Sequence, residues 1–149
     1  MPTCTFFGHR DCPDSVFEEL KKTIMDLIEK RGVKTFLVGN SGNFDALVRR
    51  SLKELKKEYD FEYFVVIPRV LSNAENEYYK EKGEILLLPD GFEKVPPKFC
   101  IDYRNKYMLN KAEYVVSYVT HPFGGAAKFT EMAEKQKKAV INIASPANP

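Results

Sequence analysis

The amino-acid sequence predicts a single α/β domain over residues 1–149, with a doubly wound, mostly parallel sheet and helices on both faces. Two observations carry this prediction. Short β-branched and aromatic runs alternate with longer segments of helical periodicity along nearly the whole chain. Several of the short runs are continuously apolar, as expected for strands that are covered on both faces. Right-handed β-α-β crossovers would then join the strands into one sheet.

The first half of the chain alternates strands with amphipathic helices. Thr3 to Phe7 is β-branched and aromatic, and it predicts a first, central strand that Gly8 ends. Ser15 and Glu18 have the spacing of a capping box, and the helix after them has an apolar face that stops at Gly32. The other elements predicted here are a strand over 35–38, a helix with apolar positions from 44 to 55, and a strand over 61–67.

The second half predicts further strands and helices and a tail. The polar, Asn- and Glu-rich stretch 69–82 predicts a loop with a helical turn or two. A proline-rich tail, 145–149, ends the sequence. The regular elements predicted between them are strands over 85–88, 114–119 and 140–143, a helix over 102–111 and a helix that includes 133–138.

Composition and charge argue against several classes of protein. The net charge of +2 is too small to favour nucleic acid as a partner. No apolar run approaches the ~20 residues of a membrane span, and no signal peptide is visible, so no membrane contact is expected. Three cysteines do not make a disulfide framework, which favours a reducing, cytoplasmic location. His9 and His121 are the only histidines and CxxC spacing is absent, so we expect no metal site and no cofactor.

Three glycine-containing turns follow predicted strands: Gly8-His9-Arg10, Gly39-Asn40-Ser41-Gly42 and Gly124-Gly125-Ala126. Parallel strands end at one edge of a sheet, so the three turns should converge there. The last turn leads into a helix, whose first N–H groups suit a phosphate. The convergence predicts a crevice with backbone donors and the cation Arg10, suited to a phosphorylated ligand. The alternative is that these are ordinary βα turns, in which glycine is common.

Four segments, in order along the chain, resemble the SLOG superfamily. Thr5-Phe6-Phe7-Gly8-His9-Arg10 resembles the F-x-G-H-R opening of YpsA-related members. The Gly39 loop with the following Phe44-Asp45 resembles their G-x-x-x-G-F-D segment, with Asn43 in place of the second glycine. Gly124-Gly125 is similar to the P-G-G-x-G-T-x-x-E motif of the LOG phosphoribohydrolases. Arg104 lies in a stretch similar to the R-x-x-x-M that precedes this motif.

This resemblance implies a Rossmann-like domain that binds a nucleotide or a nucleotide-derived small molecule. Carried over by position, Gly124 and Gly125 would hold phosphate. Arg104 and Glu131 would be the catalytic pair for hydrolysis of an N-glycosidic bond, in which a carboxylate stabilises positive charge on the sugar. The LOG resemblance is also compatible with a homodimer. The SLOG resemblance implies an alternative function, that of a non-catalytic sensor or sequestering protein for a nucleotide-derived signal.

The sequence departs from the LOG motif just after the glycine pair. Ala127 stands where the motif has its third glycine, and Lys128 stands where it has threonine. Lys128 would add a cation for phosphate but removes a hydroxyl donor. Phosphate binding tolerates these changes better than the geometry of hydrolysis does.

Each further candidate has a structural explanation beside the functional one. Asp45 is a ribose contact or an acid near a helix start, and Asn105 contacts ligand or solvent. Arg104 also fits a surface position on a polar helix. Glu131 also fits the first turns of a helix, where the helix dipole favours acids. His9 contacts a ligand or caps a turn. The aromatic residues that would stack on a base, or belong to the core or a dimer surface, are Tyr103, Tyr107 and Phe123.

Overall fold

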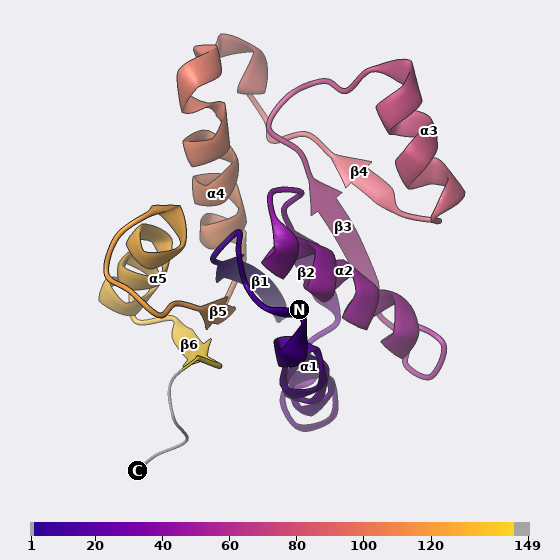
Figure 1. Cartoon of the computed structure of the whole chain (residues 1–149), viewed down its shortest axis with the longest axis vertical. Helices are drawn as coiled ribbons and strands as arrows, with labels where there is room; N and C mark the ends of the chain where they lie inside the picture. The colour runs from indigo at the N-terminus through magenta and orange to yellow at the C-terminus, as the bar shows by residue number, and fades with distance from the viewer. Residues whose placement is uncertain (1, 145–149) are drawn as a thin grey trace.

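The computed structural model describes residues 2–144 and contains a six-stranded sheet with the strand order β4-β3-β2-β1-β5-β6. Every pair of neighbouring strands is parallel. The predicted doubly wound, parallel α/β fold is therefore confirmed (Figure 1). The predicted tail, 145–149, lies outside the described residues.

The strands and helices follow the predicted order, apart from an additional helix over 73–81. The strands are β1 (Thr3–Gly8), β2 (Thr35–Val38), β3 (Glu62–Val66), β4 (Ile85–Leu87), β5 (Tyr114–Tyr118) and β6 (Ala139–Asn142). The helices are α1 (Phe17–Arg31), α2 (Asn43–Leu55), α3 (Asn73–Glu81), α4 (Cys100–Lys111) and α5 (Gly125–Lys135). Short 3₁₀ helices lie at Asp14–Val16, Phe92–Lys94 and Pro97–Phe99. Within residues 2–144, none of these helices has the length and apolar character needed to cross a membrane.

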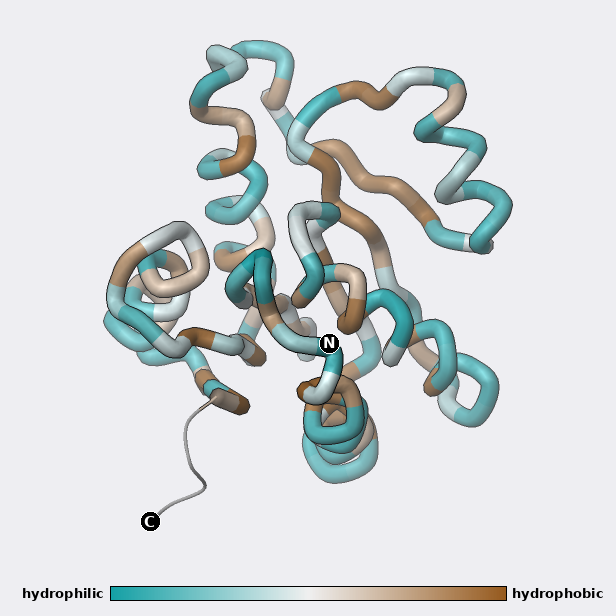
Figure 2. The backbone as a smooth tube through the Cα atoms, in the orientation of Figure 1, coloured by the Kyte–Doolittle hydropathy of each residue, from teal (hydrophilic) through white to brown (hydrophobic). Residues whose placement is uncertain are grey.

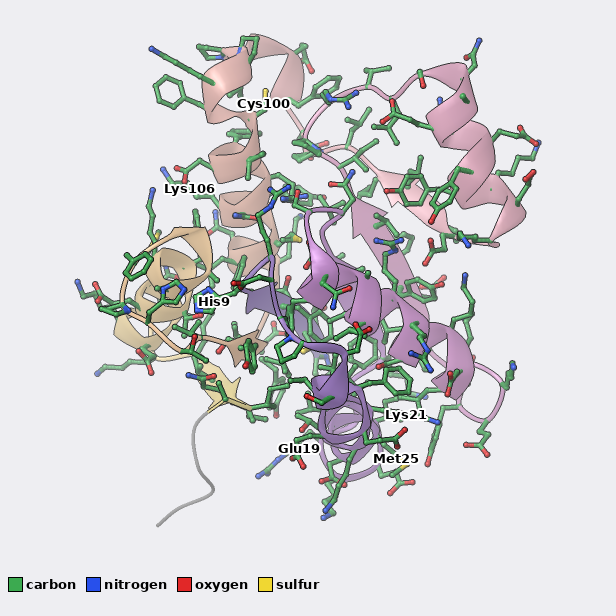
Figure 3. The ribbon with its side chains drawn as sticks, in the orientation of Figure 1. His9, Glu19, Lys21, Met25, Cys100 and Lys106 are labelled. Carbon is green, nitrogen blue, oxygen red and sulfur yellow. The ribbon has the colours of Figure 1, made fainter. Side chains whose placement is uncertain are left out.

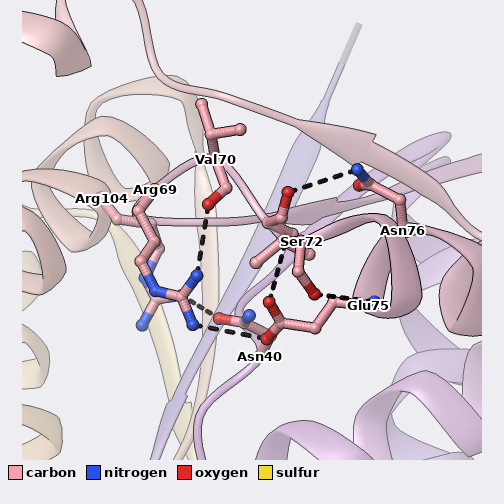
Figure 4. A network of polar contacts seen from close by, with 8 residues as sticks. Asn40, Arg69, Val70, Ser72, Glu75, Asn76 and Arg104 are labelled. Atoms are coloured by element: carbon pink, nitrogen blue, oxygen red, sulfur yellow. Dashed lines mark hydrogen bonds and ion pairs between the residues drawn. The ribbon is translucent and has the colours of Figure 1, made fainter.

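Three local predictions were wrong. No side chain caps α1, because residues 14–16 form a 3₁₀ turn and the helix proper begins only at Phe17. The capping box lies instead at α3, where the Ser72 hydroxyl accepts from the Glu75 N–H at 3.2 Å and the Glu75 carboxylate accepts from the Ser72 N–H at 2.9 Å (Figure 4). This helix of nine residues replaces most of the predicted loop. In addition, α5 begins at the glycine pair, as predicted, but ends at Lys135, so residues 136–138 of the predicted helical segment are not helical.

The sheet separates two apolar layers. Figure 1 shows α4 and α5 on the opposite side of the sheet from α1 and α2. Successive side chains of a strand point to opposite faces, so Phe6 packs with Phe36 in the layer under α1 and α2, while Phe7 packs with Phe129 under α5. The hydropathy colouring in Figure 2 follows this arrangement, with brown strands such as β3 inside and teal segments on the outer helices. β1 is therefore buried on both faces, as its sequence predicts.

The strand order reverses between β1 and β5. From β1 the chain winds outward to β2, β3 and β4, and it then returns to the other side of β1 to form β5. The connections after β1 and β5 therefore leave the sheet toward opposite faces, and a crevice forms between them. The His9 N–H donates to the Tyr118 carbonyl at 3.2 Å and holds the two turns together.

Gly8, the last residue of β1, is required by packing. A Cβ at this position would lie 2.2 Å from Cγ of the buried Phe44 ring. We expect Gly8→Ala to lower the free energy of unfolding by about 1–3 kcal/mol, as overpacking of a core does. Urea unfolding measures this loss. The double variant with Phe44→Leu should be less destabilised than the sum of the two single variants, and strict additivity would contradict the proposed clash.

Candidate functional site

A cavity of about 430 Å³ opens at the carboxyl edge of the sheet, between the β1 turn, the start of α2, α4 and the start of α5. The structure brings most of the proposed site residues together in its wall. These are Gly8, His9, Arg10, Ser41, Asp45, Arg104, Asn105, Gly124, Gly125 and Ala126.

Three other candidates lie directly behind this wall. Gly39 has no room for a side chain, because a Cβ there would lie 2.8 Å from Asp45 Oδ2 and 2.9 Å from Arg104 Nη1. A Cβ on Gly42 would lie 2.6 Å from the Arg10 Cα. Asn40 accepts a hydrogen bond from Arg104. Close packing therefore accounts for glycine at these positions of the first two turns.

Lys128 and Glu131 lie outside the cavity wall. The Lys128 ammonium pairs with the Asp102 carboxylate at 2.9 Å. Glu131 pairs with Lys135 at 3.2 Å, and its side chain is 69% exposed. Because α5 begins at Gly125, Glu131 lies about 9 Å along the helix axis from its first residue. The structure therefore does not bring Glu131 together with Arg104.

Arg104 is buried on α4, with only 2% of its surface exposed. Its Nε donates to Asn105 Oδ1 at 2.8 Å, Nη1 donates to Asn40 Oδ1 at 3.0 Å and to the Val66 carbonyl at 3.1 Å, and Nη2 donates to Ser41 Oγ at 3.3 Å. Figure 4 shows the bond to Asn40. These acceptors are neutral, and no carboxylate of residues 2–144 lies within ion-pair distance of the guanidinium. The positive charge of Arg104 therefore lacks a direct counter-ion.

Asp45, at the start of α2, is the buried carboxylate of the wall. Its Oδ2 accepts from the Ser41 N–H at 2.9 Å. Burial raises the pKa of Asp45, and the nearby charge of Arg104 opposes this rise. Burial also lowers the pKa of Arg104, which Asp45 opposes, and Arg10 lowers it further. The two buried groups thus stabilise each other's charge at longer range than an ion pair, while Arg10 and Asp11 lie at the exposed rim.

The first turn of α5 offers backbone donors to the cavity. Its N-cap, Gly124, has a φ of 93° and provides no side-chain cap. The first helical hydrogen bond of α5 runs from the Lys128 N–H to the Gly124 carbonyl at 3.0 Å, so the preceding N–H groups have no partner within the helix. A Cβ on Gly125 would meet nothing within 4 Å. The space beside Gly125 is therefore open, unlike that beside Gly8 and Gly39.

Sequence reasoning missed several residues of the wall as site residues. Some are apolar and serve the core as well, and they could not be separated from it by pattern. The residues missed are Phe6, Phe7, Asp11, Ile101, Met108 and His121, whereas Phe123 was among the aromatic candidates for stacking on a base. For these, the one available signal was the place of His121 in the short connection between a predicted strand and a glycine pair.

His9 is held in its neutral form by its surroundings. Figure 3 labels it between β1 and α5. Its Nε2 accepts a hydrogen bond from the Thr120 N–H at 2.9 Å, so this nitrogen carries no proton and Nδ1 does. Burial lowers the pKa of His9, His121 lowers it further, and Asp11 opposes both.

This environment predicts that acid destabilises the fold through His9. Because the pKa is lower in the folded state, the stability that neutral His9 contributes is present above the ordinary histidine value of 6.5 and is lost as the pH falls below it. Through one such group, the free energy of unfolding changes by at most about 1.4 kcal/mol per pH unit. Urea unfolding of wild type and His9→Gln at pH 7.5 and 5.5 measures it. The variant, whose amide oxygen can still accept from Thr120, should lose less stability between the two values; an equal loss would contradict the prediction.

The strand order and the cavity at its reversal define a Rossmann-like α/β protein with a ligand-sized crevice. No protein-family model matches the sequence, and no curated protein sequence matches it. Solved structures share its fold. DNA processing protein A (DprA) from Streptococcus pneumoniae superimposes with a TM-score of 0.69 at 17% identity, over 94% of this chain and 49% of DprA. The chain thus spans about half the length of that protein.

Two further structures show the same likeness. DprA from Helicobacter pylori has a TM-score of 0.67 at 15% identity, over 99% of this chain and 67% of that one. The molybdenum cofactor carrier protein from Chlamydomonas reinhardtii has a TM-score of 0.57 at 17% identity, over 99% of this chain and 79% of that one. At such identities the likeness establishes the fold. The likeness extends to the fold alone and does not favour the YpsA-related branch that the sequence resembles.

One expectation from the sequence is overturned by these relatives. The small net charge argued against nucleic acid as a partner, yet the Helicobacter pylori structure was described for its single-stranded DNA binding mode. Phosphate binding depends on the local arrangement of cations and N–H donors, and the net charge of the whole chain does not describe this arrangement. Net charge therefore does not set nucleic acid aside for a chain with this fold.

Proposed function

We propose that this protein binds a nucleotide or a nucleotide-derived small molecule, with a phosphate group at the first turn of α5. One observation carries the proposal: a single cavity wall contains both the buried, charged Arg104 and the N–H groups at the start of α5. A helix N-terminus and an arginine are two of the groups that proteins most often use for phosphate. A cavity of about 430 Å³ has the size of a small-molecule site.

The arrangement of the glycines supports the same place for the phosphate. Gly8, Gly39 and Gly42 are each explained by a neighbour that a Cβ would strike. Gly125 has no such neighbour and no positive φ, so nothing in the fold itself requires glycine there. An unsubstituted backbone at this position lets an anion approach the N–H groups closely.

Binding without turnover is the form of this function that the side chains support. The LOG-like hydrolysis would need the Glu131 carboxylate beside the sugar, whereas Glu131 is exposed and pairs with Lys135 on α5. A sensor or sequestering protein needs only the binding surface. We therefore propose that the protein binds and releases its ligand without changing the ligand chemically.

Thermal-shift measurements test the binding proposal. The panel contains mononucleotides, ADP-ribose, NAD and cyclic dinucleotides, and it includes short single-stranded DNA because of the DprA fold. A ligand at a hundred times its dissociation constant adds about 2.7 kcal/mol of stability. For a chain of this size the midpoint should rise by roughly 5–10 °C. A flat response across the panel would contradict the proposal.

Mass spectrometry of the ligand after incubation separates binding from hydrolysis. We expect the bound compound to be recovered intact from wild type, with no free base. Glu134→Ala is the matched control for Glu131→Ala, because both carboxylates are exposed on α5. Release of free base by wild type and by Glu134→Ala, but not by Glu131→Ala, would show that the protein is the hydrolase that the LOG resemblance implies.

A further inference from the structure

Three aromatic rings form a column on the cavity wall. The ring centroids of His9 and His121 lie 3.8 Å apart with 12° between their planes. Those of His121 and Phe123 also lie 3.8 Å apart, with 18° between their planes. Tyr118, at the end of β5, packs edge-on against His9 with centroids 6.2 Å apart. The column thus begins at the sheet and ends at Phe123.

The inner end of the column is fixed and the outer end is open. His9 is only 7% exposed, and hydrogen bonds from its own N–H to Tyr118 and from Thr120 to its Nε2 hold it. His121 Nδ1 lies within hydrogen-bond distance of the Phe123 carbonyl, at 3.1 Å. Phe123 itself is 67% exposed. Single exposed apolar residues are common, but this ring lines the cavity and is oriented by the two rings behind it.

We infer that Phe123 is the platform on which the base of the bound nucleotide stacks. This inference rests on the proposed function and adds the base subsite to it. Gly124 and Gly125 follow Phe123 directly, so the free ring face and the phosphate donors of α5 are adjacent in the chain. A nucleoside 5′-phosphate carries a flat ring and a phosphate on one ribose and can engage both. Because every base has a π-face, the platform accepts all four bases.

The other two aromatic candidates from the sequence have different roles. The Tyr103 hydroxyl donates to the Asp90 carbonyl. Tyr107 packs against the apolar layer that contains Met108 and Leu109. Neither residue lines the cavity. Phe123 is therefore the member of that set which is placed to meet a base.

Affinities for AMP, UMP and ribose 5-phosphate test the platform, because these ligands share a phosphate and differ in the base. Wild type should bind the two nucleotides roughly 5- to 150-fold more tightly than ribose 5-phosphate, the range expected from stacking. Phe123→Ala should lose this preference and keep its affinity for ribose 5-phosphate. Phe99→Ala is the matched control, since Phe99 is 50% exposed and lies outside the cavity wall.

Fluorescence provides a second readout, because the chain contains no tryptophan. In Phe123→Trp the single indole would form the platform, and AMP should quench its emission while ribose 5-phosphate should not. Phe99→Trp should respond to neither compound. Equal affinity of wild type for all three ligands would overturn the platform. The same holds if Phe123→Ala lowers the affinity for ribose 5-phosphate as much as the affinity for AMP. If none of the three binds, the inference fails, and the proposed function fails with it only if the whole thermal-shift panel is flat as well.

Discussion

Replacing Arg104 by methionine should lower the free energy of unfolding by about 2–4 kcal/mol and abolish ligand binding. The substitution leaves buried acceptors of the network without a donor, among them the Val66 carbonyl and Asn40 Oδ1. It also removes the cation that opposes the raised pKa of the buried Asp45 carboxyl. Urea unfolding measures the stability and isothermal titration measures the affinity. Arg104→Lys keeps the positive charge but has fewer hydrogen-bond donors, so its stability and its affinity should lie between those of wild type and Arg104→Met.

The pH dependence of Arg104→Met shows how much of its loss in free energy of unfolding is electrostatic and how much comes from lost packing and hydrogen bonds. Burial raises the pKa of Asp45, so the stability associated with its protonated form is present below the unfolded value of about 3.9 and is lost as the pH rises through the folded value. Removing Arg104 raises that pKa further. Arg104→Met should therefore be more destabilised at pH 7 than at pH 4.5, and Asp45→Asn in the same background should restore part of the loss. An equal loss at both pH values, without rescue, would contradict this coupling.

Gly125→Val should weaken ligand binding roughly 10- to 100-fold while leaving the stability almost unchanged. The new side chain would enter space in which no protein atom lies within 4 Å of the Cβ, so the fold can accommodate it. The same space is where the phosphate would meet the N–H groups of α5, and the loss of one or two charge-assisted hydrogen bonds gives this range. Titration with the ligand found in the thermal-shift panel measures the effect.

Two neighbouring positions control this experiment. Ala127→Val places the same side chain in the same helical turn but off the cavity wall, and it should bind like wild type. Gly124→Ala should instead lower stability by about 1–2 kcal/mol, because its φ of 93° is strained for any residue with a Cβ. Binding by Gly125→Val as tight as that of wild type would place the phosphate elsewhere.

Sequence reasoning succeeded where local pattern decides structure. Apolar runs such as Tyr114 to Val119 predicted buried strands, and the parallel sheet followed from their alternation with helices. The meeting of the Gly8 and Gly124 turns at one edge also followed, because parallel strands share the direction in which they end. The capping box of α3 was readable in Ser72 and Glu75 but was missed, because the helix after it has little apolar periodicity.

The sequence by itself thus determined the order of the strands and of every helix except α3, and the edge of the sheet at which the glycine turns meet. Only the tertiary structure decided what the individual side chains do there. Arg104 looks like a surface residue of a polar helix, yet packing of α4 buries it among acceptors from the Gly39 loop and β3. Glu131 faces solvent because the buried side of α5 consists of Phe129, Thr130 and Ala133. The His9–His121–Phe123 column joins two loops that the sequence separates by more than a hundred residues, and no periodicity records such a contact.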